Sequence, residues 1–387
     1  MKSVLPERKT LHPHSIEHRE LSPATGQAVR ELAYEIAITF DPAPGATAHT
    51  LTDPALIERI TARAGELPAE ARMVMRPPTT ATGATVVHGL PLTDDECGPT
   101  PPDWRMAARW SGDPDHRSCS FQIDIAMLLL ATLAGEPFGW QGQQNGRLVN
   151  NIIPAIGHED EQSGASSSTL LSPHTEDAFH PRRANLLMLA CLRNPDRVGT
   201  TVSSVRQVEL DARQRRILGT PTLPILPDVS YGCGFDRATA PAVPTIWSES
   251  DEFETDTTPD DLTLRFDPAY TPLDAADPDF RAAYRHLEEE LERVCILAVL
   301  EPGELLLVDN DVAVHGRVPF TARYDGTDRW LKRVNIRLPE RRRRPTESRE
   351  NGYGQQIVAP FGAARPETVA AQTQRDGTDD RGSVEHT

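Results

Sequence analysis

The sequence has few cysteines, and they are widely scattered. Only five occur in 387 residues, their number is odd, and none forms a Cys-x-x-Cys pair. A disulfide scaffold and a zinc ribbon both need closely spaced cysteines, so the sequence argues against both classes. We therefore expect a reduced, cytoplasmic protein. The cysteines are Cys97, Cys119, Cys191, Cys233 and Cys295.

Long apolar runs are also lacking. The most apolar stretch, residues 123–135, contains Asp124 and is too short to span a bilayer. The first 20 residues contain no apolar core of the length found in signal peptides. We therefore predict no membrane-spanning segment and no membrane partner.

Positive charge is in deficit. The chain has 40 Lys and Arg against 57 Asp and Glu, which gives a formal net charge of −17. Nucleic acids and anionic membranes are bound by a net basic face, so neither is expected as a partner. A locally basic pocket for a small anion is compatible with this balance.

The apolar residues that are present, 38% of the chain, suffice for the core of one large domain. Their helical spacing predicts helices over residues 23–39, 52–66, 121–134 and 277–300. Short apolar runs divided by turns predict strands at 147–154, 184–193, 199–205, 244–249, 262–267, 303–310 and 330–338. This order indicates a mixed β fold with α, built as a sandwich or barrel rather than as a parallel α/β sheet.

The chain is expected to form a single catalytic domain over residues 1–340. Its helical N-terminal part covers about 20–135, and its strand-rich core covers about 140–338. Residues 341–387 are polar and poor in apolar side chains, which predicts a mobile C-terminal tail. The Arg341–Arg344 run in this tail is interpreted as a solvated end.

The densest cluster of candidate metal ligands is SPHTEDAFHP, residues 172–181. His174 and Glu176 are two residues apart, so on a strand both side chains point to one face and can converge on one ion. Imidazole and carboxylate suit Fe(II), Zn(II) or Mn(II). Alternatively, the two are a surface pair, or Thr175 or Asp177 caps a helix. His180 is expected to support the site or to lie at the surface.

A third candidate ligand, His315, lies far along the chain after an apolar run and an Asp-Asn-Asp turn. Arg329 follows it after 14 residues, and Arg333 lies four further on. Alternation along this strand places both arginines on one face and Trp330 and Val334 on the other. Guanidinium groups bind carboxylates through paired, charge-assisted hydrogen bonds. The arginine face therefore predicts a dicarboxylate site, unless it is a solvated outer face.

The pattern His-x-Glu, a distal His and an Arg fourteen residues later resembles the iron(II)/2-oxoglutarate oxygenases of the clavaminate synthase-like group. Within that group it is most similar to the amino-acid β-hydroxylases of the arginine type. The resemblance implies a double-stranded β-helix (jelly-roll) core with flanking N-terminal and inserted helices. The matching segments are QQNGRLVNNIIP (143–154), HTEDAFHPRRANLLML (174–189), NPDRVGTT (194–201) and HGRVPFTARYDGTDRW (315–330).

Carried over position by position, the resemblance implies that His174, Glu176 and His315 bind Fe(II). The related halogenases lack the carboxylate, so the presence of Glu176 implies hydroxylation. The co-substrates implied are 2-oxoglutarate and O2.

The resemblance also implies binding roles for three further residues. Arg329 holds the distal carboxylate of 2-oxoglutarate, Thr201 is the hydroxyl partner of this arginine, and Arg333 lies nearby.

On the substrate side, the resemblance implies contacts from Gln143, with Gln144 as a rival, from Glu176 and from Asp267. In the arginine hydroxylases an acid at the position of Asp267 faces the substrate guanidinium, and a second acid follows two residues later. That second position is Ala269 here. This departure puts arginine itself in doubt and leaves a basic or polar amino acid as the expected substrate.

The resemblance thus predicts hydroxylation of an unactivated C–H of a free basic or polar L-amino acid, such as arginine, in antibiotic or other secondary-metabolite biosynthesis. Residues 227–245 fall where the family has a substrate-covering lid, and their Gly and Pro content fits a mobile loop. A desaturase or cyclase on the same substrates is one alternative. The other is a non-catalytic or zinc-binding jelly-roll protein, in which Arg329 and Thr201 have no evident purpose.

Overall fold

The computed structural model describes residues 15–40, 51–113, 119–232, 234–235, 240–248, 262–341 and 343–362. Its α-helices are α1 (Pro23–Thr39), α2 (Pro54–Arg63), α3 (Ala69–Val74), α4 (Trp104–Gly112), α5 (Cys119–Ala134), α6 (Ala212–Gly219) and α7 (Pro278–Arg293). The short 3-10 helices include η3 (Gln144–Gly146), η5 (Val229–Tyr231), η8 (Pro345–Arg349) and η9 (Gly352–Gly354).

The described residues also form fourteen strands. They are β1 (Glu17–Glu20), β2 (Ala84–His88), β3 (Glu136–Trp140), β4 (Val149–Ile152), β5 (Leu171–His174), β6 (Leu186–Arg193), β7 (Thr200–Ser204), β8 (Ile246–Ser248), β9 (Leu262–Leu264), β10 (Ile296–Ala298), β11 (Leu305–Asp309), β12 (Ala313–Arg317), β13 (Trp330–Arg337) and β14 (Ile357–Val358).

The described strands form two main sheets and a hairpin. The larger sheet has the order β1-β2-β11-β6-β13-β3-β14, and β4 also pairs with β13. The smaller sheet has the order β10-β7-β12-β5, and β8 pairs with β9. All of these pairings are antiparallel except β1 with β2. The extensive antiparallel sheets confirm the predicted mixed β fold with α.

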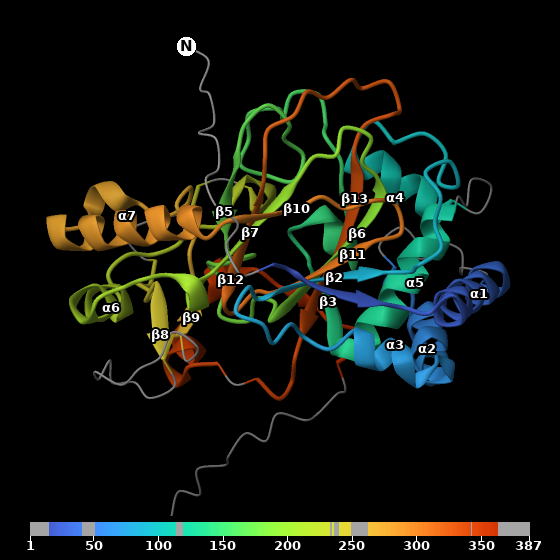
Figure 1. Cartoon of the computed structure of the whole chain (residues 1–387), viewed down its shortest axis with the longest axis horizontal. Coiled ribbons are helices and arrows are strands. Elements are labelled where there is room, and N and C mark those ends of the chain that lie inside the picture. The colour runs from blue at the N-terminus through green and yellow to red at the C-terminus, as the bar shows by residue number, and fades with distance from the viewer. Residues whose placement is uncertain are drawn as a thin grey trace, which may run out of the picture.

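The larger sheet separates two hydrophobic cores. On β6, Leu186 and Met188 face the core shared with α1, α2 and α5, whereas Leu187 and Leu189 face the core shared with the smaller sheet and α7. This follows from the two-residue period of a strand. Figure 1 shows the resulting layers, with α1 to α3 and α5 at one end of the molecule and α6 and α7 at the other.

Helix α5 is buried along most of its length and carries one acid, Asp124. Its carboxylate lies 2.5 Å from Nη2 of Arg147 and 2.5 Å from Nζ of Lys332, and all three side chains are fully buried. A buried charge is tolerated when it is paired and hydrogen-bonded. The cluster therefore joins α5 to β13, the strand that carries Arg333 and directly follows Arg329.

The predicted helices agree with the structure at 23–39, at 52–66 (where a 3-10 turn extends α2) and at 121–134. The helix predicted over 277–300 is too long. It ends at Arg293, because the apolar residues that follow form β10, which pairs with β7. Apolar runs of this length suit a buried strand as well as a helix.

The segment after residue 340 differs from the predicted mobile tail. Residues 341 and 343–362 lie against the core, where β14 pairs with β3. Arg341 and Arg343 each donate at 2.6 Å to an acid of the Asp-Asn-Asp turn, Asp309 and Asp311 respectively. Arg341 and Arg343 are therefore neutralised by buried acids rather than solvated. Residues 363–387 lie outside the described residues.

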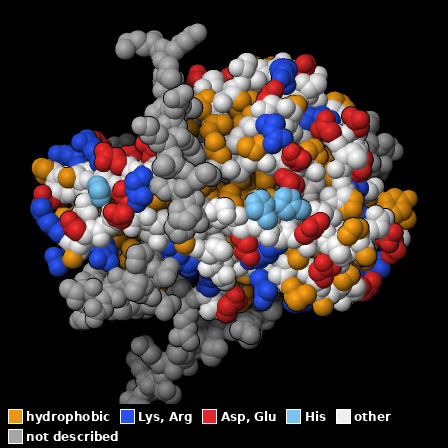
Figure 2. Space-filling view, in the orientation of Figure 1, with side chains coloured by type: hydrophobic (Ala, Val, Ile, Leu, Met, Phe, Trp, Pro, Cys, Tyr) orange, Lys and Arg blue, Asp and Glu red, His pale blue; other side chains and the backbone are white. Residues whose placement is uncertain are grey.

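No helix within the described ranges is long and apolar enough to cross a membrane. On the face seen in Figure 2, acidic and basic side chains are interspersed rather than separated by sign.

Candidate active site

The two predicted histidine ligands are brought together by strand pairing. His174 ends β5 and lies directly opposite His315 of β12, so their ring centroids are 4.5 Å apart. Oε2 of Glu176 lies 3.6 Å from Nε2 of His174 and 3.4 Å from Nε2 of His315. One donor atom from each of the three residues thus lies within 4.8 Å of the others.

This arrangement fits a divalent metal ion. Oε2 of Glu176 is buried and has no hydrogen-bond partner among the described residues, which leaves it available as a ligand. Nδ1 of His174 is 2.8 Å from the carbonyl oxygen of Ser172, which orients the ring as outer partners of metal-bound histidines do. Two histidines and one carboxylate are the donor set of non-haem Fe(II) oxygenases. Within the described residues, no other group of three His, Cys, Asp or Glu side chains converges in this way.

Burial and neighbouring charges shift the pKa values of Glu176 and His174 in opposite directions. Burial alone would raise the pKa of Glu176, but the charge of Arg333 and the closeness of both histidines hold it well below its usual value. Burial would likewise lower the pKa of His174, but Glu176 raises it to about 9. Burial and the charge of His174 lower the pKa of His315 to about 4. The centre therefore combines an ionised carboxylate, Glu176, with a neutral imidazole, His315. Both forms can donate an electron pair to a metal cation.

Glu176 is fixed on both its backbone and its side chain. Its N–H donates to Oδ1 of Asn310 at 2.8 Å, and Nδ2 of Asn310 donates to its carbonyl at 3.1 Å. Its other carboxylate oxygen pairs with Nη1 of Arg333. Nη2 of Arg333 donates to Oε1 of Gln143 at 2.8 Å. Arg333 therefore contacts Glu176 and Gln143, whereas the sequence had placed it with the co-substrate.

Arg329 lies in the same pocket with a different partner from the one predicted. Its Nη2 donates to Oγ1 of Thr200 at 3.1 Å, not to Thr201. Thr200 lines the pocket, whereas Oγ1 of Thr201 lies over Gly316 and has no hydrogen-bond partner in the part of the chain that the structure describes. Neighbouring residues of a strand point to opposite faces, so a shift of one residue changes the side chain that faces the pocket.

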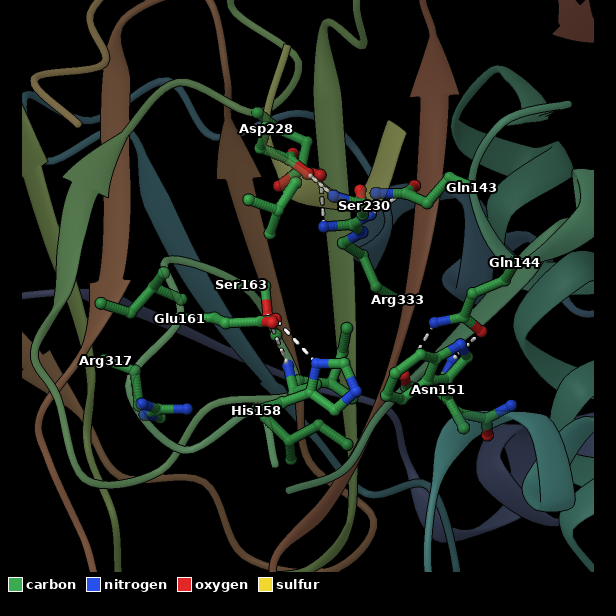
Figure 3. A pocket seen from close by; sticks show the side chains of 18 of the residues that line it. Gln143, Gln144, Asn151, His158, Glu161, Ser163, Asp228, Ser230, Arg317 and Arg333 are labelled. Atoms are coloured by element: carbon green, nitrogen blue, oxygen red, sulfur yellow. Dashed lines mark hydrogen bonds and ion pairs between the residues drawn. The ribbon is translucent and has the colours of Figure 1, made fainter. Parts of the chain in front are cut away.

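The pocket that joins these groups has a volume of about 840 Å³. Arg329 and Leu331 of the β13 region line it, as does Arg333, whereas Trp330 and Val334 lie in the helix-side core, as the strand alternation predicted. Figure 3 shows Gln143, Arg333, Asp228 and Ser230 grouped at one end of the pocket and Arg317 apart from them.

Only some of the predicted substrate contacts line the pocket. Gln143 and Gln144 both line the pocket, but the amide of Gln144 is held by the backbone N–H and C=O of Asn151, each at 2.9 Å. Asp267 is buried beside the site rather than in the pocket lining, and it accepts from the backbone N–H of Ala269 at 3.1 Å. Burial raises the pKa of Asp267 to about 7.

Asp228 is a pocket residue that the sequence did not single out. It caps η5, with Oδ1 accepting from the N–H of Ser230 at 2.6 Å, and burial raises its pKa. It lies in the segment predicted as a lid, of which residues 228–230 line the pocket. The sequence feature that could have identified it is its position, as an acidic residue at the start of the predicted lid. Residues 233 and 236–239 of the segment lie outside the described residues.

The alternative readings of SPHTEDAFHP are not supported. No helix begins at Thr175 or Asp177. Oγ1 of Thr175 accepts from the N–H of Phe266 at 3.1 Å. The ring of His180 packs against Trp140 with centroids 4.4 Å apart, so His180 supports the loop.

Comparisons with known proteins agree with this site. Residues 120–335 match the family model described as "Taurine catabolism dioxygenase TauD, TfdA family". Enduracididine beta-hydroxylase of Streptomyces hygroscopicus is 37% identical over 294 residues, which are 70% of this chain and 82% of that protein. Clavaminate synthase 2 of Streptomyces clavuligerus is 32% identical over 268 residues, which are 66% of this chain and 74% of that protein.

Crystal structures of the non-heme iron oxygenase OrfP share the fold. The complex with Fe, succinate and (3R,4R)-dihydroxy-L-Arg superposes with a TM-score of 0.68 at 34% identity, covering 82% of this chain and 93% of OrfP. The complex with Fe and alpha-ketoglutaric acid gives a TM-score of 0.67 at 35% identity, covering 83% and 94%.

These relationships confirm the resemblance to the clavaminate synthase-like amino-acid hydroxylases that the motifs predicted. The residues matched by the family model include both histidines, Glu176 and Arg329. This chain belongs to the TauD/TfdA family of dioxygenases.

Proposed function

We propose that the protein is an Fe(II)- and 2-oxoglutarate-dependent dioxygenase that hydroxylates a free basic L-amino acid in secondary metabolism. One observation carries the proposal: the His174–Glu176–His315 cluster and the buried Arg329 open onto the same pocket. A metal centre that shares a cavity with a carboxylate-binding guanidinium is what a keto-acid co-substrate requires.

Under this proposal each residue has a defined task. His174, Glu176 and His315 hold Fe(II), which with 2-oxoglutarate and O2 supplies the oxidising power for C–H hydroxylation. Arg329 and Thr200 bind the distal carboxylate of 2-oxoglutarate and so orient it. The Arg333 guanidinium keeps Glu176 ionised, because it pairs with the carboxylate oxygen that does not face the histidines.

The preference for a basic substrate rests on the acids near the site. Asp228 lines the pocket, and its carboxylate accepts a hydrogen bond from the backbone N–H of Ser230. Burial raises the pKa values of Asp228 and Asp267, and a cationic side chain would favour their ionised forms. The relatives fit this view, since OrfP was solved with a hydroxylated arginine.

We also propose that the two sheets are the halves of a double-stranded β-helix and that residues 1–340 form one catalytic domain. The pocket is lined from both sheets, by Arg329, Leu331 and Leu189 on one side and by His174 and His315 on the other.

Coupled turnover tests the function. Purified protein with Fe(II), 2-oxoglutarate and O2 is expected to release succinate faster when L-arginine, L-ornithine or L-lysine is added. Asparagine serves as the neutral comparison and is expected to stimulate less. Succinate release that no amino acid stimulates would contradict the proposal.

A further inference from the structure

Arg317 is a buried cation of the pocket to which neither the motif resemblance nor the proposed function assigns a task. It ends β12, two residues after His315, and it lines the pocket with 4% of its surface exposed. Within the part of the chain that the structure describes, its N–H groups donate only to neutral oxygens, those of Ser166, Thr169 and Val318. It therefore brings a positive charge to the cavity without an acid to balance it.

Strand register places Arg317 beside the Arg329 site. Arg317 is directly opposite Thr200 in the β12–β7 pairing, and Thr200 is the residue that accepts from Arg329. Side chains opposite each other in an antiparallel pair share a face, with Cβ atoms about 4.5–5.5 Å apart.

The position of Arg317 is fixed before any ligand binds. Ser166 and Thr169 of the loop between β4 and β5 accept its N–H groups with their carbonyl oxygens, and Phe320 lies under the guanidinium with its centroid at 5.0 Å. A charge held in this way loses no side-chain entropy when an anion arrives. Two fixed guanidiniums at one end of a pocket favour an anion more strongly than one does.

We propose that Arg317 is a positioning residue for the co-substrate: it supplies a second positive charge at the end of the pocket that receives the distal carboxylate of the keto acid. The inference rests on the proposed use of 2-oxoglutarate. It makes selection of a dicarboxylic over a monocarboxylic keto acid depend on Arg317 as well as on Arg329. The competing view is that Arg317 only anchors the loop that contains Ser166 and Thr169.

Calorimetric titration of the full chain loaded with Mn(II), which binds without turnover, separates the two views. The ligands are 2-oxoglutarate and 2-oxovalerate, a keto acid of equal chain length without the distal carboxylate, the latter measured by competition if it binds weakly. In Arg317→Gln the Kd of 2-oxoglutarate is expected to rise about tenfold or more, the loss typical of a charged polar contact. The Kd of 2-oxovalerate is expected to change less than about twofold, since it lacks the group that the charge attracts.

Arg317→Lys keeps the charge and is expected to retain most of the preference for 2-oxoglutarate. It decides the question alone if the glutamine variant does not fold: loss of the preference in a lysine variant with a native melting curve would overturn the proposal. The matched control is Arg323→Gln, which removes an arginine paired with Asp196 outside the pocket.

Two outcomes in Arg317→Gln would contradict the inference. One is a Kd for 2-oxoglutarate close to that of the unmodified protein, and the other is an equal loss of affinity for both keto acids, which would indicate loop anchoring. Failure of the unmodified protein to bind 2-oxoglutarate would instead reject the proposed function.

Discussion

Replacing Arg329 by methionine is expected to make the metal-loaded protein more stable while abolishing its response to 2-oxoglutarate. Arg329 is buried, with 6% of its surface exposed. Among the described residues, its guanidinium donates only to the neutral Oγ1 of Thr200. Burial lowers its pKa to about 10. A buried guanidinium without a counter-charge destabilises the folded state until an anion binds.

The magnitude follows from this lowered pKa. An ordinary arginine has a pKa near 12.5 or above, and each tenfold change in protonation corresponds to about 1.4 kcal/mol, so the burial penalty is roughly 3 kcal/mol. Because the folded pKa is the lower one, the penalty is fully present below pH 10 and disappears only as the pH rises towards the unfolded value. Loss of the bond to Thr200 offsets about 1–2 kcal/mol, which leaves a net gain of about 1–2 kcal/mol.

Urea denaturation of the Mn(II)-loaded protein, with and without 2-oxoglutarate, measures both effects. At a ligand concentration a hundred times Kd, the unmodified protein should gain about 2.7 kcal/mol of unfolding free energy, and Arg329→Met should gain none. Arg337→Met replaces a half-buried arginine of β13 that does not line the pocket, and this variant should keep the ligand response. The reasoning is refuted if Arg329→Met is less stable than the unmodified protein by more than about 1 kcal/mol, or is stabilised equally by 2-oxoglutarate.

Three further predictions follow from the structure. Thr200→Val should raise the KM for 2-oxoglutarate about tenfold through loss of its bond to Arg329, and Thr201→Val should not, which steady-state kinetics would show. Asp228→Asn should raise the KM of a basic amino acid at least about tenfold with the Kd of 2-oxoglutarate unchanged; equal kinetics in both proteins would remove Asp228 from the substrate site. Burial, with nearby arginine charges, lowers the pKa of His180 to about 3, so the unfolded chain binds a proton below about pH 6.5 and the folded chain does not. Between pH 6.5 and pH 5 this should remove about 2 kcal/mol of stability, and urea titrations of His180→Asn should lack that loss.

Local sequence patterns were enough to predict the direction of several side chains in the site. The two-residue period placed Arg329 and Arg333 on the pocket face and Trp330 on the opposite face, because β13 is a long central strand and Arg329 directly precedes it. The spacing of His174 and Glu176 likewise corresponds to two side chains that converge on one point.

The errors lie where position depends on distant parts of the chain. Thr200 rather than Thr201 faces the pocket because the register of β7 is set by its pairing with β12 and β10. Asp228 lies in a segment without periodicity, so no pattern marks its direction. Arg341 and Arg343 meet their acids through contacts spanning about thirty residues, which local composition does not encode.

The measurement that tests the central claim most directly is the mass of the product formed from the basic amino acid that most stimulates succinate release. The account predicts a product with one oxygen atom more than the substrate, formed together with succinate by the unmodified protein and lost in His174→Ala. A product with two hydrogen atoms fewer would identify a desaturase, and turnover that leaves every basic amino acid unchanged would contradict the account.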